Sequence, residues 1–444
     1  MRGRGGKIGP VAAGAIVAGN MIGSGVFLLP ASLGAIGSIT LVGWIIVLAG
    51  CLLLGWVCAT LAMLRPGGLG LTGYVHDALG PYLGFQSAFI YWIATWFGNV
   101  AIALAVTGYL GSFVAAMKVP AMLAGATIAI IWLMTLINLS GARLIARFEG
   151  AALVLGLAPV LLVGGLGWVW FDPALFAAGW NVTGGSDGKA LLASLGLIIW
   201  AFLGLESAAV VAAVVKRPER DVPLATAGGI LVAGLTYIIA CTSLMGVMPA
   251  AELAASTAPF AEVAARIWGP VAGSILAVCA MVKAAGTLAG WMLVGAETAE
   301  AASELGLFPR TLSKINAHGA PSRNLIVTAL LMSVVCIATL SATLGEQFSM
   351  VVNMAVVLNV LVYAYACLAL LRLSPAITPP ARRLWTRATA LAGLAFALLI
   401  IGLSEVWMLA IAALILALTL PLYLLTRPRP TPHSGRSGRA AGEP

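Results

Sequence analysis

The chain has 444 residues, of which 61% are hydrophobic and only 9% are charged. A water-soluble domain usually carries about a quarter charged residues, so these charges are too few to cover a soluble protein of this length. The net charge of +9 does not indicate nucleic-acid binding, because the basic residues are spread over the segments between apolar runs. The composition therefore predicts an integral membrane protein.

The hydrophobic residues recur in runs of roughly 18–25 residues, long enough to cross a hydrocarbon core about 30 Å thick. They predict an all-α membrane protein with one transmembrane domain over about residues 10–426. Its twelve helices are expected at 10–32, 38–63, 83–112, 119–139, 147–170, 189–215, 224–247, 270–299, 325–343, 348–373, 386–403 and 405–426. Residues 1–9 form the N-terminus, and the Pro-, Gly- and Arg-rich residues 427–444 are expected to form a disordered tail.

The basic residues predict the orientation of these helices. If the N-terminus is cytoplasmic, the outer side keeps only Lys118, Lys189 and Arg266 of the 24 basic residues, and Lys283 alone falls inside a span. Basic residues accumulate in cytoplasmic loops. We therefore expect both termini in the cytoplasm and a location in the bacterial inner membrane, with the lipid bilayer as a partner.

The sequence lacks the residue patterns of an enzyme or a metalloprotein. All six cysteines lie in apolar runs without a C-x-x-C pair, and the three histidines fall in connecting or tail segments. There is no H-E-x-x-H, no G-x-S-x-G and no histidine or aspartate inside a predicted span. We expect no cofactor, no metal and no catalytic residue. A channel is disfavoured because repeated polar rings are missing.

Two predicted spans carry polar and glycine-rich interruptions near their middle, at Gly19–Gly25 and at Trp200–Ser207. Five helices separate them, which favours two inverted five-helix repeats, about 10–170 and 189–373, with discontinuous first and sixth helices and two extra helices over about 386–426. Broken helices expose N–H groups that attract a carboxylate and carbonyls that attract an ammonium group. The alternative is that Gly23-Ser24-Gly25 serves only close helix packing. Asn20 and the second interruption favour a binding site.

The first interruption, Gly19-Asn20-Met21-Ile22-Gly23-Ser24-Gly25-Val26-Phe27-Leu28-Leu29-Pro30, resembles the basic amino-acid/polyamine antiporters of the amino acid–polyamine–organocation superfamily, and among them the arginine/agmatine exchangers most. The resemblance runs from about Pro10 to Leu373. Further matches are Tyr91-Trp92, Ala94, Trp96, Gly98-Asn99, Trp200 to Ser207, Gly290-Trp291 and Tyr363. It implies the inverted-repeat fold with two extra helices, often as a homodimer. It also implies sodium-independent, proton-sensitive exchange of an amino acid for its decarboxylated amine by alternating access.

The resemblance also assigns roles to residues. Carbonyls near Asn20 and Trp200 would hold the α-amino group, Asn99 would couple binding to helix movement, Trp200 would cover the substrate and Trp291 would form a middle gate. The substrate carboxylate would lie against the backbone of Met21, Ile22, Gly23, Ser24 and Gly25, and the remaining contacts would come from Ala94, Thr95, Phe202, Leu203 and Asn353. Thr95, Asn353 and the neighbouring Ile102 differ from the arginine exchanger's pattern. The tryptophans and Phe202 could instead be packing aromatics.

Glu206 is the strongest candidate for gating or proton coupling, because a carboxylate near the bilayer centre is unfavourable unless it is paired, hydrated or protonated. Its alternative role is a structural hydrogen bond between helices. Tyr91, Tyr363 and Thr72 are further candidates for gating or proton coupling. Thr72 stands where the family often has a tyrosine.

Lys283 lies about 20 Å along its helix from the outer end, too deep to reach water easily. Its ammonium could fill the space of a coupling cation in sodium-dependent relatives, or act as a fixed charge for an anionic group, unless the predicted span boundary is displaced. Glu149, Glu297 and Glu300 lie near cytoplasmic helix ends and are expected to form interfacial ion pairs. The main alternative function is proton-coupled uptake of a neutral amino acid.

Overall fold

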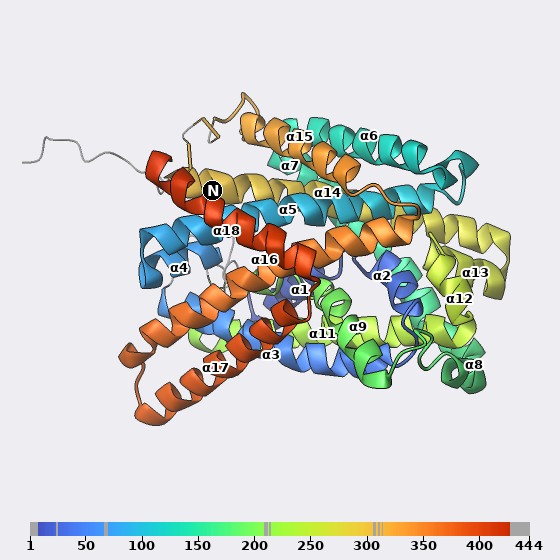
Figure 1. Cartoon of the computed structure of the whole chain (residues 1–444), viewed down its shortest axis with the longest axis horizontal. Helices are drawn as coiled ribbons and strands as arrows, with labels where there is room; N and C mark the ends of the chain where they lie inside the picture. Colours follow the sequence, from blue (N-terminus) through green and yellow to red (C-terminus); the bar gives the residue numbers. More distant parts are fainter. Residues whose placement is uncertain are drawn as a thin grey trace, which may run out of the picture.

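The computed structural model describes residues 8–23, 25–65, 70–207, 212, 215–304, 308–309, 311–312 and 314–426. Within these residues every secondary-structure element is a helix. The one β-type contact is an isolated parallel bridge between Ile8 and Val215. Most of the long helices run along the long axis of the molecule (Figure 1). This arrangement is that of a helical membrane domain.

Over the described residues, nine helical segments are long and apolar enough to cross a membrane. They are α3 (Thr40–Leu64), α5 (Pro81–Leu110), α6 (Pro120–Leu139), α7 (Ala142–Pro159) continued by η2 (Val160–Leu166) and η3 (Gly167–Trp170), α11 (Pro218–Val247), α14 (Pro270–Glu304), α16 (Leu344–Leu373), α17 (Pro380–Gly402) and α18 (Val406–Thr426). A tenth candidate is the pair α1 (Pro10–Met21) and α2 (Gly25–Gly34), bent by 54°.

Two predicted spans correspond to shorter helices. α9 (Asp187–Trp200) occupies the first part of the predicted sixth span, and α15 (Ser322–Ala338) occupies the ninth. The other helical segments are η1 (Ala115–Lys118), α4 (Gly70–Leu79), α8 (Pro173–Ala178), η4 (Leu205–Ser207), α12 (Ala250–Ala255), α13 (Pro259–Trp268) and η5 (Ser374–Ala376). The structure thus agrees with a polytopic all-α protein, while the count of twelve spans and the two inverted repeats stay predictions.

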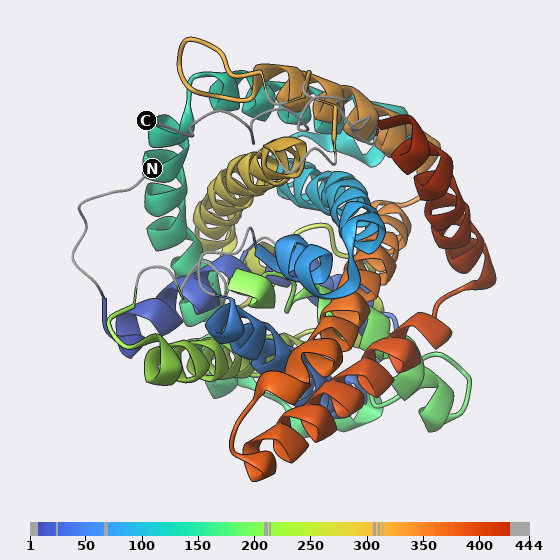
Figure 2. The same cartoon turned by 90° about the vertical axis from the view of Figure 1, so that its left-hand side faces the viewer.

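The centre of the bundle is formed by α5 and α16, whose most apolar stretches are 83% and 78% buried, against 17% for α18. The view along the bundle shows α18 (dark red) at the edge and α4 (blue) near the middle of the end that faces the viewer (Figure 2). Small residues allow close helix approach in a membrane. On α3, a Cβ on Gly50 would lie 2.3 Å from the Phe396 ring of α17, so only glycine fits between these helices.

The two interruptions predicted from the sequence lie against each other. α1 ends at Met21, and α9 ends at Trp200, followed by a turn in which Gly204 has φ +105°, a conformation that favours glycine. The Asn20 amide Nδ2 donates a hydrogen bond of 2.8 Å to Ser207 Oγ. A Cβ on Gly204 would lie only 3.2 Å from the Asn20 carbonyl oxygen. The breaks of α1 and α9 therefore form one polar junction inside the bundle.

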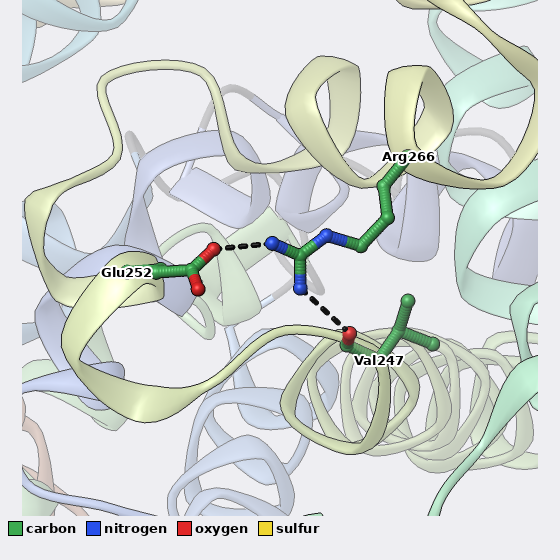
Figure 3. A network of polar contacts seen from close by, with 3 residues as sticks. All are labelled: Val247, Glu252 and Arg266. Carbon is green, nitrogen blue, oxygen red and sulfur yellow. Dashed lines mark hydrogen bonds and ion pairs between the residues drawn. The ribbon is translucent and has the colours of Figure 1, made fainter.

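The opposite end of the bundle from α4 is covered by short helices (Figure 1). There the Arg266 guanidinium of α13 contacts the Glu252 carboxylate of α12 and donates a 3.3 Å hydrogen bond to the carbonyl oxygen of Val247, the last residue of α11 (Figure 3). α12 also packs closely on α2, since a Cβ on Gly34 would lie 3.0 Å from Leu253. These contacts tie α2, α11, α12 and α13 together over this end.

Candidate functional site

A chamber of about 50 Å³, here called the central chamber, lies at the junction of the two breaks. Its wall comes from the end of α1, from α5, α14 and α16, and from the turn after α9, and no charged side chain lines it among the described residues. The lining residues are Asn20, Met21, Gly23, Tyr91, Ala94, Thr95, Gly98, Asn99, Ile102, Trp200, Ala201, Leu203, Thr287, Trp291 and Asn359. Most of the predicted substrate residues are therefore brought together.

Two buried donors on this wall have no hydrogen-bond partner among the described residues: Asn99 Nδ2 and Trp200 Nε1. Their residues are only 1% and 9% exposed. A buried donor without a partner costs about 1–3 kcal/mol. A ligand with hydrogen-bond acceptors would relieve that cost, so the central chamber is equipped to bind a polar molecule.

Some backbone N–H and C=O groups at the α1 break form hydrogen bonds within the protein. The carbonyl oxygen of Met21 accepts a 2.5 Å hydrogen bond from the Tyr237 hydroxyl, and Ile22 N–H donates to Ala18 O at 2.7 Å. α14 approaches the break closely, because a Cβ on Gly23 would lie 3.0 Å from Thr287 Cγ2. Gly23 thus leaves only enough room for a tight contact with Thr287, and Ser24 lies outside the described residues.

Glu206 is held by three donors from three parts of the chain. Its carboxylate accepts hydrogen bonds from the hydroxyls of Tyr91 on α5 at 2.8 Å and Tyr363 on α16 at 2.7 Å, and from Gly204 N–H at 3.1 Å. Hydrogen bonds to a carboxylate are among the stronger ones in proteins. These hydrogen bonds join α5 and α16 to the break after α9.

A second chamber of about 360 Å³, the end chamber, lies on the side of α4. One face of α14 lines it, with residues three or four apart in sequence, as helix geometry requires. These residues are Lys283, Thr287, Gly290, Trp291, Val294, Glu297, Thr298 and Ala301, and the rest of the wall is Gly19, Asn20, Gly70, Leu71, Thr72, Tyr91, Glu149, Glu206 and Ser207. Asn20, Tyr91, Thr287 and Trp291 line both chambers, so these four residues stand on the shared boundary.

Lys283 is 3% exposed and lies well inside the apolar segment Pro270–Ser303. Its Nζ donates a 3.0 Å hydrogen bond to Thr287 Oγ1, one turn further along α14. The stem of its side chain fills the space beside Gly156, where a Cβ would lie 2.2 Å from Lys283 Cγ. Lys283 is therefore built into the interface between α7 and α14.

Glu149 and Glu297 differ from expectation. They were predicted to form interfacial ion pairs, but both line the end chamber, and neither takes part in an ion pair found among the described residues. The Glu149 carboxylate faces α14 at Gly290, where a Cβ would lie 2.7 Å from its oxygens. The absence of a side chain at Gly290 leaves room for this carboxylate, so α7 places it toward the chamber rather than toward a loop.

Several predicted residues lie outside both chamber walls. Phe202 is fully buried and its ring packs edge-on against Trp44 and Tyr237, so it belongs to the core in this structure. Asn353 lies beside Gly196, and Asn359 occupies the chamber wall in its place. Ile22 is also absent from both walls.

Three residues that were not predicted as site residues also line the central chamber: Ala201, Thr287 and Asn359. Thr287 lies four residues before Trp291 and therefore on the same helix face, and this spacing is the signal that could have indicated it.

Comparison with known proteins identifies the family of this chain. The amino acid permease family matches residues 8–434, almost the whole chain. The chain belongs to the amino acid permease family. This membership agrees with the membrane fold, with the family resemblance of the α1 break, and with a transporter rather than an enzyme.

Individual relatives within this family are transporters of amino acids and amines. A cadaverine/lysine antiporter of Escherichia coli strain K12 is 38% identical over 371 residues, covering 82% of this chain and 83% of that protein. The putrescine transporter PotE of the same strain is 32% identical over 377 residues, covering 85% and 86%. A putrescine transporter of Haemophilus influenzae is 32% identical over 364 residues. These names concern amino acids and amines, and none of the three names arginine or agmatine.

Proposed function

We propose that this permease exchanges a basic amino acid for a decarboxylated amine across the bacterial inner membrane by alternating access. The observation that carries the proposal is the central chamber, an uncharged, aromatic-walled space at the meeting point of two broken helices, next to a chamber with three carboxylates. The 38% identity to a cadaverine/lysine antiporter supports the same class of substrate. The proposed exchange is proton-sensitive and independent of sodium.

The chemistry of the central chamber suits an α-amino acid with a cationic side chain. The N-terminal end of α2 attracts a carboxylate, and the carbonyl end of α1 near Asn20 attracts an ammonium group. Trp200 and Trp291 offer aromatic faces to a cationic group, an interaction worth about 2 kcal/mol when it is desolvated. Asn99 Nδ2 and Trp200 Nε1, which have no partner within the described part of the chain, supply donors to the carboxylate.

The substrate proposal is broader than arginine and agmatine. Lysine with cadaverine, and a putrescine-type diamine, are included because relatives covering more than four fifths of the chain carry those names. Asn353 was expected to contact the substrate, but it does not line the central chamber. Thr95, Ile102 and Asn359 do line it. These three residues are the proposed determinants of side-chain length and head group.

Movement is proposed to depend on the Glu206 site. Its three donors join α5, α16 and the turn after α9, so protonation of Glu206 would weaken all three contacts at once. Trp291 and Thr72, which line the end chamber, complete the proposed gate. The inverted repeats, about residues 10–170 and 189–373, supply the rocking movement.

The test is uptake of radiolabelled lysine or arginine into proteoliposomes preloaded with lysine, cadaverine, arginine, agmatine, putrescine, leucine or nothing, at acidic and neutral pH. Uptake that requires a basic amino acid or a diamine inside is the expected result. Equal uptake into empty vesicles would overturn exchange.

The uncharged wall of the central chamber favours one alternative, proton-coupled uptake of a neutral amino acid. Leucine uptake into empty vesicles, driven by a pH gradient alone, would identify it.

A further inference from the structure

We infer that the Lys283 ammonium is the charge by which this protein distinguishes an amino acid, which carries a carboxylate, from its decarboxylated amine. The inference rests on the proposed exchange and assigns a specificity-determining residue within the same site. It is drawn from the position of Lys283 in the wall of the end chamber, from its hydrogen bond to Thr287, which lines both chambers, and from the charged residues of the same wall.

Among the described residues that line the two chambers, Lys283 is the sole cation, and the end chamber that it lines is also lined by Glu149, Glu206 and Glu297. Its ammonium has three N–H donors, of which one bonds Thr287 Oγ1. Neither ion pair found in the described part of the chain includes Lys283. A buried charge of this kind in a membrane span is unfavourable unless it is paired, and it marks a functional site.

The surrounding carboxylates are not equally free to pair with it. Glu206 already accepts hydrogen bonds from Tyr91, Tyr363 and Gly204. Glu149 lines the same chamber as Lys283 and comes from α7, the helix that packs against α14. Glu149 is therefore the counter-charge available to Lys283 while no substrate carboxylate is present.

Thr287 connects Lys283 to the central chamber. Its hydroxyl oxygen accepts from Lys283 Nζ, so its own proton is free to be donated elsewhere, and its side chain lines both chambers. Thr287 also lies against Gly23, beside the start of α2, where the substrate carboxylate is proposed to bind. A carboxylate at this place would accept a hydrogen bond from the Thr287 hydroxyl. The Lys283 ammonium, bonded to the same hydroxyl oxygen, would strengthen that hydrogen bond by its charge.

The two exchanged substrates differ in their response to this charge. An amino acid places a carboxylate beside Thr287 and gains the attraction of the ammonium, whereas the decarboxylated amine brings only positive charge and is repelled by it. Because a diamine carries one more net positive charge than the matching amino acid, Lys283 favours the amino acid in the shared site. Removing the ammonium should therefore change the two affinities in opposite directions.

The experiment measures the half-saturating concentrations of lysine and of cadaverine for exchange in proteoliposomes. Lys283→Met is expected to lower the preference for lysine over cadaverine on the order of tenfold, equivalent to about 1.4 kcal/mol. Lys283→Arg, which keeps the charge, should restore part of the preference. Thr287→Val should shift it in the same direction as Lys283→Met. Lys189→Met, at an exposed position in the first turn of α9 and outside both chamber walls, is the matched control.

The outcomes separate the possible failures. If the wild-type protein exchanges neither substrate, the proposed function is wrong. If wild-type exchange is present but Lys283→Met and Thr287→Val change both half-saturating concentrations equally, or only lower the amount of folded protein, the selectivity role is wrong. Sodium-dependent uptake gained by Lys283→Met would also overturn it, because the ammonium would then occupy the place of a coupling cation. A shift in Thr287→Val alone, with Lys283→Met unfolded, would still support the inference.

Discussion

Replacing Tyr363 with phenylalanine removes one of the three donors to Glu206 without altering the ring that packs in the core. The lost contact is the 2.7 Å hydrogen bond from the Tyr363 hydroxyl, which leaves Tyr91 at 2.8 Å and Gly204 N–H at 3.1 Å. A hydrogen bond to a charged group contributes about 1.5–3 kcal/mol. If the three-donor arrangement belongs to this conformation alone, its population relative to the alternate state should fall about 10- to 150-fold.

The population can be followed by chemical labelling. Thr298 lies on the wall of the end chamber and is partly exposed, so Thr298→Cys reports whether that chamber is accessible. Cys279 is the partly exposed native cysteine and would be replaced by serine, since the other five are buried. The predicted orientation places the end chamber on the cytoplasmic side, so inside-out vesicles expose it. In these vesicles a membrane-impermeant maleimide should label Thr298→Cys more slowly when Tyr363→Phe is added.

Two further variants decide whether the effect acts through Glu206. Tyr74→Phe is the matched control, because Tyr74 is a buried tyrosine whose hydroxyl is not bonded to Glu206. Adding Tyr363→Phe to Glu206→Gln should have a smaller effect than adding it to the wild type, because residues in one hydrogen-bond network are not additive. Unchanged labelling and unchanged exchange in Tyr363→Phe would refute the idea that this site stabilises the conformation.

Two other predictions concern the chamber wall and the packing of the bundle. Trp200→Leu should raise the half-saturating concentration of cationic substrates by about 30-fold, the equivalent of about 2 kcal/mol, whereas Trp385→Leu, at a position 62% exposed, should leave it unchanged in the same uptake assay. Gly50→Ala should destabilise the protein by about 1–3 kcal/mol because its Cβ would meet the Phe396 ring at 2.3 Å. Gly125→Ala, with no atom within 4 Å of the new Cβ, should unfold at or above the wild-type temperature in detergent.

The sequence predicted the parts of this structure that depend on chain-local physics. An apolar run long enough to cross a bilayer has few alternatives to a helix, because no water is present to satisfy its backbone. The glycine-rich stretch after Asn20 and the Trp200–Ser207 stretch were recognisable as breaks because polar residues and glycines interrupt an otherwise apolar run there. Glu206 was recognisable because a carboxylate is so unfavourable there. Each of these arguments requires only the residue and its neighbours along the chain.

The rotation of each helix about its axis could not be predicted in the same way. Asn353 and Asn359 lie on one helix, but six residues at about 100° each turn them to different faces, and only packing determines which one meets the chamber. Likewise Glu149 was expected at an interface, yet the missing side chain at Gly290 admits its carboxylate toward the end chamber. These placements depend on small residues of neighbouring helices, which a single run of sequence does not reveal.

The proposed exchange requires that the empty carrier change conformation more slowly than the loaded one. In this structure the two breaks are already joined by the hydrogen bond from Asn20 to Ser207, and Glu206 is fully engaged by its three donors. The buried donors Asn99 Nδ2 and Trp200 Nε1, in contrast, have no partner among the described residues. A substrate that satisfies these donors gains binding energy at the junction itself, and any part of that energy that differs between the two conformations shifts their populations. The junction thus gives a physical reason for movement to depend on an occupied chamber, whether the occupant is the amino acid or the amine.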